Sequence, residues 1–150
     1  MTNHEIKNEL PPNYEELKKS ANRTSDWRER LAAVEELGNW NHKQTIDVLT
    51  RLMTSDPVYK IQEAAYRKLS AFGEDVSLPP KEKGELFKGI TKILLRIKKS
   101  LPAGHTYDEF KEKLKKMRSD VYDTYEGEKG ADFDQWLETK WAALTDKVRP

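Results

Sequence analysis

The chain has no cysteine among its 150 residues. Disulfide bridges, zinc sites built on thiolates and cysteine nucleophiles are therefore excluded. Long apolar runs are missing too: the apolar cluster at 93–95 is short, whereas a membrane-spanning helix needs about 20 residues. The first residues also lack the apolar core of a signal peptide. These absences predict a soluble, cytoplasmic protein that does not enter a membrane.

A large net charge of one sign is missing as well. The 27 Lys and Arg residues balance 26 Asp and Glu residues, so that the formal net charge is +1. Taken whole, the chain has neither the basic excess typical of a nucleic-acid binder nor an acidic solvating tail. Its length suits one hydrophobic core, and we expect residues 1–150 to form a single domain.

Alternation of apolar and polar residues with period two, the pattern of a half-buried strand, is not found. Apolar residues instead recur at three- and four-residue steps, which predicts helices. The predicted helices cover residues 25–37, 43–54, 57–72, 84–100, 106–125 and 133–148, and a short helix follows Asn13. The chain is therefore predicted to be all-α.

Several helix ends carry recognisable signals. Ser25 or Asp26 can cap the helix that follows, and Gly38 lies where a left-handed residue would end it. Thr106 and Glu109 have the spacing of a capping box.

Prolines and glycines mark the expected breaks. Pro57 after Asp56 indicates an N-cap followed by a proline in the first helical turn. Pro79 and Pro80 cannot continue a helix, so that residues 74–83 are expected to form a linker or capping loop. The two glycines within 127–130 predict a turn before the last helix.

The sequence repeats itself at an offset of 32 residues. Small side chains recur at equivalent positions, and small residues allow neighbouring helices to approach closely. Such a period with paired helices is typical of a helical solenoid. The matching pairs are Trp27 with Tyr59, Arg28 with Lys60, Ala32–Ala33 with Ala64–Ala65, Leu37 with Leu69, and Trp40 with Phe72.

The segment SDWRERLAAVEELGNW resembles the opening helix of the short HEAT-like repeats named after the phycobilisome lyases, and DPVYKIQEAAYRKLSAFG is similar to a second copy. The resemblance implies an α-α superhelix with two HEAT-like repeats over 25–78. A tail and capping helix over 1–24 would precede them, and helices over 84–148 would pack on them as a C-terminal helical bundle cap. Two unrelated helices that meet through small residues stay the competing interpretation.

The resemblance implies a scaffold without catalysis. We expect a protein-protein interaction or adaptor module whose partner is another protein. The expected contact residues are Arg28, Arg30, Arg67 and Lys68, with Trp40 as an apolar anchor.

No residue pattern favours an enzyme. None of His4, His42 and His105 has a partner at metal-ligand spacing on one helix, and the His-Glu pairs of HEAT-repeat metal hydroxylases do not recur in the repeats. No serine lies in a G-x-S-x-G elbow, and no glycine-rich loop follows a strand. We expect no cofactor, no metal and no small-molecule substrate. A lysine-rich chain without cysteine would suit a low-GC bacterium or its phage.

A second function class rests on charge distribution. Residues 81–118 hold twelve Lys and Arg against five Asp and Glu. Lys88, Lys92, Arg96 and Lys99 recur at four, four and three residues, on one helical stripe that can neutralise nucleic-acid phosphates. DNA glycosylases built on HEAT-like repeats offer a precedent by resemblance. Three alternatives stay open: a solvated helix face, an acidic protein partner, or the acidic segment 119–150 of the chain itself, which holds eight Asp and Glu against four Lys and Arg.

Trp136 and Trp141 lie five residues apart, about 140° around a helix. We expect them not to share one buried stripe, which leaves open that one lies in the core and the other in a contact surface, although the core is the expected place of each.

Overall fold

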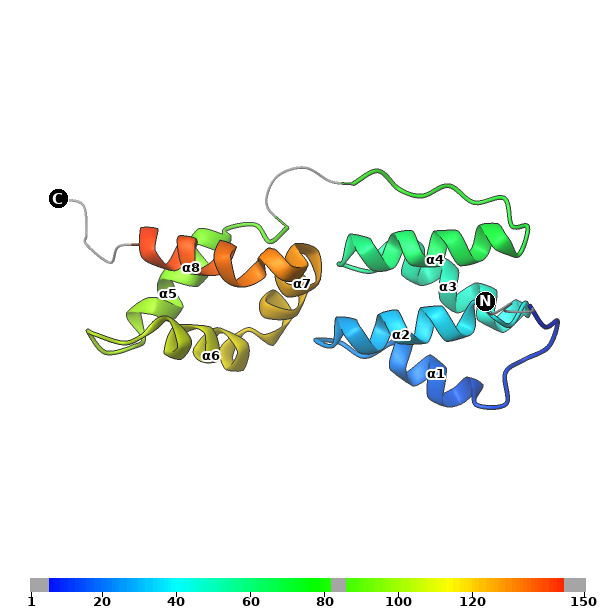
Figure 1. Cartoon of the computed structure of the whole chain (residues 1–150), viewed down its shortest axis with the longest axis horizontal. Coiled ribbons are helices and arrows are strands. Elements are labelled where there is room, and N and C mark those ends of the chain that lie inside the picture. The colour runs from blue at the N-terminus through cyan, green and yellow to red at the C-terminus, as the bar shows by residue number, and fades with distance from the viewer. Residues whose placement is uncertain (1–5, 82–85, 145–150) are drawn as a thin grey trace. The chain divides into compact units, whose positions relative to one another are not determined.

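The computed structural model describes residues 6–81 and 86–144, and within them the chain is helical (Figure 1). It divides into two compact units, Met1–Lys81 and Glu82–Pro150, called here the N-terminal and the C-terminal unit. Each unit has its own cluster of buried hydrophobic side chains. That the helices of 84–148 pack on the repeats within one domain stays a prediction.

The N-terminal unit consists of two helical hairpins. Its helices are α1 (Tyr14–Ala21), α2 (Trp27–Leu37), α3 (Lys43–Ser55) and α4 (Tyr59–Ala71). α1 packs mainly on α2, and α3 packs mainly on α4, whereas α2 and α3 touch little. Contacts of α2 with α4 and of α1 with α3 then stack the hairpins into two layers. The short helix predicted after Asn13 is therefore the first helix of the first hairpin.

The 32-residue offset coincides with the packing of α2 against α4. Both helices begin at equivalent aromatic residues, Trp27 and Tyr59. Ala33, Ala64 and Ala65 are buried, as close helix packing requires, while Ala32 is exposed. Three of the four small residues thus serve the predicted contact.

Extended segments before α1 and after α4 pack on this core through Leu10, Val76 and Leu78. Residues 74–80 run back along α4, where the Tyr59 hydroxyl donates to the Pro79 carbonyl at 2.8 Å, and Val76 and Leu78 pack on the core. The segment after α4 is therefore a covering strap, in agreement with the predicted capping loop. Before α1, the Lys7 amide donates to the Asn39 carbonyl at 2.9 Å.

Two N-terminal capping signals are confirmed, and one is wrong. The Asp26 carboxylate accepts from the Glu29 amide, and Thr106 with Glu109 forms the predicted capping box. Pro57 does not lie in the first turn of a helix, because α4 begins two residues later with Val58 as its N-cap.

The C-terminal unit contains α5 (Ile90–Lys99), α6 (Tyr107–Met117), α7 (Ser119–Lys129), a 3-10 turn η1 (Gly130–Asp132) and α8 (Phe133–Ala143).

The predicted helix over 84–100 begins later, because Gly89 adopts a left-handed φ of 74°; its positions 84 and 85 lie outside the described residues. The predicted helix over 106–125 is two helices, since Arg118 leaves helical geometry at φ −137° and ψ 69°. The turn predicted over 127–130 starts only after Lys129. The predicted extension of the last helix to 148 falls largely outside the described residues.

Both C-terminal tryptophans lie half-buried at the edge of the same core. Trp136 stacks on Tyr125 at 4.6 Å between ring centroids, and Trp141 packs beside Tyr107 and Phe110 at 5.8 and 6.4 Å. Both tryptophans thus pack against the core, as expected for each, and the ring of each reaches a different set of aromatic neighbours.

Candidate functional site

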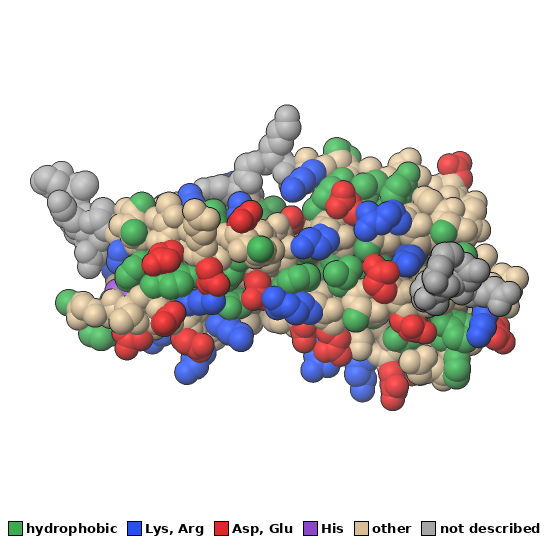
Figure 2. All heavy atoms as spheres, in the orientation of Figure 1, with side chains coloured by type: hydrophobic (Ala, Val, Ile, Leu, Met, Phe, Trp, Pro, Cys, Tyr) green, Lys and Arg blue, Asp and Glu red, His purple; other side chains and the backbone are tan. Residues whose placement is uncertain are grey.

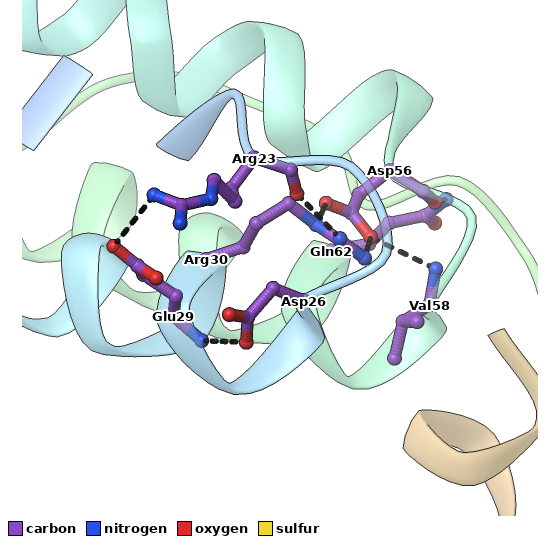
Figure 3. A network of polar contacts seen from close by, with 7 residues as sticks. All are labelled: Arg23, Asp26, Glu29, Arg30, Asp56, Val58 and Gln62. Atoms are coloured by element: carbon purple, nitrogen blue, oxygen red, sulfur yellow. Dashed lines mark hydrogen bonds and ion pairs between the residues drawn. The ribbon is translucent and has the colours of Figure 1, made fainter. Parts of the chain in front are cut away.

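Arg30 and Asp56 form a buried ion pair that joins the two hairpins (Figure 3). Arg30 Nε donates to Asp56 Oδ2 at 2.8 Å, and Arg30 Nη2 donates to Asp56 Oδ1 at 3.2 Å. Arg30 Nη1 also donates to the Arg23 carbonyl at 2.9 Å. The Val58 amide donates to Asp56 Oδ1 at 2.9 Å, and Gln62 Nε2 donates to the Asp56 carbonyl at 2.6 Å. The two buried charges are thus paired and hydrogen-bonded, as burial in a low-dielectric interior requires.

The prediction that Arg30 contacts a partner is wrong. Arg30 is 5% exposed and Asp56 is 4% exposed. α2 begins at Trp27, so that Arg30 follows three residues later on the buried face that also carries Ala33 and Val34. The 32-residue shift aligns Arg30 with Gln62, and in the structure both side chains bond Asp56.

Lys68 is bonded within its own unit. Its Nζ lies 3.1 Å from Glu35 Oε1. The methylene groups of Lys68 lie over Gly38, where an added Cβ would collide with them. Gly38 is therefore needed for this close approach; its φ of −66° is right-handed, and the predicted left-handed helix end is not found.

Trp40 is half-buried and partly covered by its own chain. Lys7 Nζ lies 5.2 Å from the centroid of the Trp40 ring, and Trp40 Nε1 donates to Glu36 Oε2 at 3.3 Å. The use of this ring as an apolar anchor for a partner stays a prediction.

Of the predicted contact residues, Arg28 and Arg67 are exposed. The Arg28 guanidinium lies 4.6 Å from the centroid of the Trp27 ring, and Lys60 Nζ lies 5.1 Å from the same ring. The layer of α2 and α4 therefore presents Arg28, Lys60 and Arg67 to solvent. On the face drawn in Figure 2, basic and acidic side chains alternate, with small groups of hydrophobic side chains between them.

The other layer holds a concave feature that the sequence did not indicate. A hollow of about 320 Å³ lies between α1 and α3. Buried Tyr14 and Val48 belong to its wall, and exposed Lys18 and Arg51 stand beside it. In the described segments neither cation forms an ion pair, although Lys18 Nζ lies 6.0 Å from the Tyr14 ring centroid. The full lining is Tyr14, Lys18, Asn22, Gln44, Asp47, Val48 and Arg51.

The predicted phosphate contacts in the C-terminal unit are all exposed. Lys92, Arg96 and Lys99 lie on α5, while Lys88 precedes Gly89 and is outside the helix. The helical stripe therefore has three members.

A carboxylate, a lysine and a tyrosine meet on the C-terminal unit. Lys111 Nζ lies 2.6 Å from Asp134 Oδ1, and the Tyr107 hydroxyl donates to the same oxygen at 3.0 Å. The hydrogen bond from Lys111 lowers the pKa of Asp134, and burial together with Asp134 raises the pKa of Tyr107. Asp134 is therefore ionised and Tyr107 neutral at pH 7, so that this trio suits a structural contact better than acid-base chemistry.

Two histidines have structural roles, and His4 lies outside the described residues. His42 caps α3, where its Nδ1 accepts from the Gln44 amide at 3.1 Å. His105 Nε2 accepts from Trp141 Nε1 at 3.0 Å, while its Nδ1 lies 2.9 Å from the Pro102 carbonyl.

Among the described residues, no group of three or more His, Asp or Glu side chains is arranged to hold a metal ion. None of the helices in these segments has both the length and the apolar character needed to cross a bilayer.

Two stacked hairpins with a 32-residue repeat define a helical-repeat protein. Residues 14–80 match the family model for HEAT repeats, so that the N-terminal unit is a HEAT-like repeat unit. The match starts at the first residue of α1 and includes both hairpins. HEAT repeats are generally protein-interaction scaffolds and are typically non-enzymatic. No curated protein and no solved structure matches the chain. Membership in the phycobilisome-lyase type of repeat stays a prediction.

Proposed function

We propose that the HEAT-like unit is a non-catalytic scaffold that binds another protein through the hollow between α1 and α3. The observation that carries the proposal is a concave wall beside two cations, Lys18 and Arg51, that form no ion pair with any described residue. Such a hollow accepts one side chain of a partner, and the contacts that dominate protein interfaces are anchors of this kind. Its volume of about 320 Å³ is near the lower end of ligand pockets, roughly 300–1,000 Å³.

The charges around the hollow favour an acidic anchor. Lys18 on α1 and Arg51 on α3 attract a carboxylate, and the side-chain amides of Asn22 and Gln44 can donate hydrogen bonds to it. Asp47 opposes such a group. The supporting helices belong to a packed core, so that little conformational entropy is lost when a partner docks.

The proposal is tested with the full chain as bait in a lysate of the source organism. Proteins retained by the bait are identified by mass spectrometry, and the affinity of the purified candidate is then measured by calorimetry. The variant Lys18→Glu/Arg51→Glu is compared with Lys19→Glu/Lys43→Glu. The control changes the same number of exposed charges on the same two helices, away from the hollow.

We expect the hollow variant to weaken binding about tenfold or more, equivalent to about 1.4 kcal/mol, and the control to change it by less than about twofold. Asp47→Asn should strengthen binding, because it removes the one repelling charge. Equal effects of the hollow variant and its control would contradict the assignment.

The predicted face on α2 and α4 provides the competing location. If Arg28→Glu/Arg67→Glu abolishes binding while Lys18→Glu/Arg51→Glu does not, the contact lies on the α2 and α4 layer and the hollow is excluded. If wild type retains no protein that survives purification and direct titration, the scaffold function itself is refuted.

A further inference from the structure

The exposed residues of α5 are all polar, and one apolar side chain, the half-buried Leu95, lies among them. α5 contains four basic residues and no acidic residue. Its apolar side chains Ile90, Leu94 and Ile97 are buried in the core of the C-terminal unit. The exposed residues of the helix are Thr91, Lys92, Arg96 and Lys99.

Only one basic residue of α5 is used by the fold. Lys98 Nζ donates to the carbonyls of Trp141 and Leu144 at 2.7 and 2.8 Å, and so binds the C-terminal end of α8. Lys92, Arg96 and Lys99 form no hydrogen bond or ion pair through their side chains with any described residue. Three cations thus remain available on one short helix.

Their spacing places them on one line. Steps of four and three residues correspond to about 6 Å and about 4.5 Å along a helix, and both steps return to nearly the same face. Three cations over about 10 Å are about 5 Å apart, which is the same order as the spacing of one phosphate per about 3.4 Å of axis along a nucleic-acid strand.

The composition of this face favours a nucleic-acid duplex over other polyanions. Protein interfaces need a desolvated apolar or aromatic core, and lysine is depleted there. On this face α5 offers one apolar side chain, the half-buried Leu95, which is too little for such a core. Single strands are bound by aromatic side chains that stack on bases, and α5 has no aromatic residue. Lysine, arginine and a threonine hydroxyl are the groups that contact duplex phosphates.

We propose that α5 of the C-terminal unit binds the phosphate backbone of a nucleic-acid duplex, without reading base sequence, through Lys92, Arg96 and Lys99. This second activity lies in the other unit and does not depend on the proposed scaffold function. Three neutralised phosphates give a slope of log K against log salt of about −2.7, and affinity should fall about 40-fold between about 50 and 200 mM salt.

The test measures fluorescence anisotropy of a labelled DNA duplex of about 25 base pairs. A duplex of this length exceeds the line of about 10 Å formed by the three cations several-fold. The full chain is titrated at several NaCl concentrations. The variant Lys92→Gln/Arg96→Gln/Lys99→Gln is compared with Lys19→Gln/Lys43→Gln/Arg67→Gln. The control loses the same three positive charges from exposed positions of the N-terminal unit. Circular dichroism confirms that all variants are folded.

We expect the α5 variant to lose at least about tenfold in affinity at low salt and most of its salt slope, and each single α5 substitution to reduce the slope by about 0.9. The control should keep the wild-type slope. Three results would overturn the proposal: equal effects of the two triple variants, a wild-type slope near zero, or tighter binding of poly-glutamate, anionic vesicles or a single strand than of the duplex.

Discussion

The Arg30–Asp56 ion pair is the interaction whose loss should damage the repeat unit most. The substitution Asp56→Ala leaves the Arg30 guanidinium buried without a counter-charge and leaves the Val58 amide without its acceptor. Removing one partner of a buried ion pair costs about 3–5 kcal/mol. A buried amide without a partner adds about 1–3 kcal/mol when water cannot reach it. Because relaxation will recover part of both, we expect about 4 kcal/mol in total.

That loss is a large share of the roughly 5–15 kcal/mol that stabilises a typical domain. Two measurements follow it. Urea unfolding at pH 7, monitored by circular dichroism, gives the change in the free energy of unfolding. Hydrogen exchange by mass spectrometry then locates the loss, which should appear in α2, α3 and α4 and leave α6 and α8 unchanged.

The exposed Arg23–Glu29 contact, with a 3.6 Å separation and side chains 54% and 35% exposed, supplies the control. Glu29→Ala removes the ion pair and a partly buried hydrogen bond from Ser20, and should cost about 1 kcal/mol. The double variant Arg30→Met/Asp56→Ala should be less destabilised than the sum of the single variants, since it leaves no buried charge. The reasoning is refuted if Asp56→Ala costs no more than Glu29→Ala.

Three further predictions concern the C-terminal unit. The pKa of Asp134 is lowered in the folded state, chiefly by Lys111. The stability that the ionised carboxylate contributes is therefore present above its unfolded pKa of about 3.9 and is lost as pH falls through the lower folded pKa. Asp134→Asn should flatten this acid dependence in urea titrations between about pH 2 and 5. His105→Ala removes the acceptor of the Trp141 indole, and should cost about 1 kcal/mol and shift the indole proton resonance in NMR spectra. Phe110 is 0% exposed, and Phe110→Ala should cost about 3–5 kcal/mol in thermal or urea unfolding; an effect below about 1 kcal/mol would contradict its core position.

Much of the helical content could be predicted from the sequence alone. Apolar spacing indicated helices because a helix face is a local property of three- and four-residue steps. The caps at Asp26 and Thr106 were also readable, since each bonds a group three residues away. The 32-residue repeat, together with the resemblance, indicated the HEAT-like class that the family match over 14–80 supports.

The candidate sites were less predictable. The hollow depends on Lys18 and Arg51 from helices that are distant in the chain and adjacent only after stacking. Arg30 is of a residue type that is usually exposed. It is buried here because it pairs with Asp56, which follows it by 26 residues in the chain. By contrast, the cations of α5 could be named in advance, because they share one face of a single helix.

The sequence by itself determined which segments are helical, how the unit repeats and where the basic residues of α5 lie, because these properties depend on neighbours within one or two helical turns. Tertiary structure alone decided that α1 pairs with α2, that Gly38 accommodates the Lys68 side chain, and that Arg30 is buried. The physical reason is that burial and charge pairing depend on atoms that are close in space, whereas helical periodicity depends on atoms that are close along the chain.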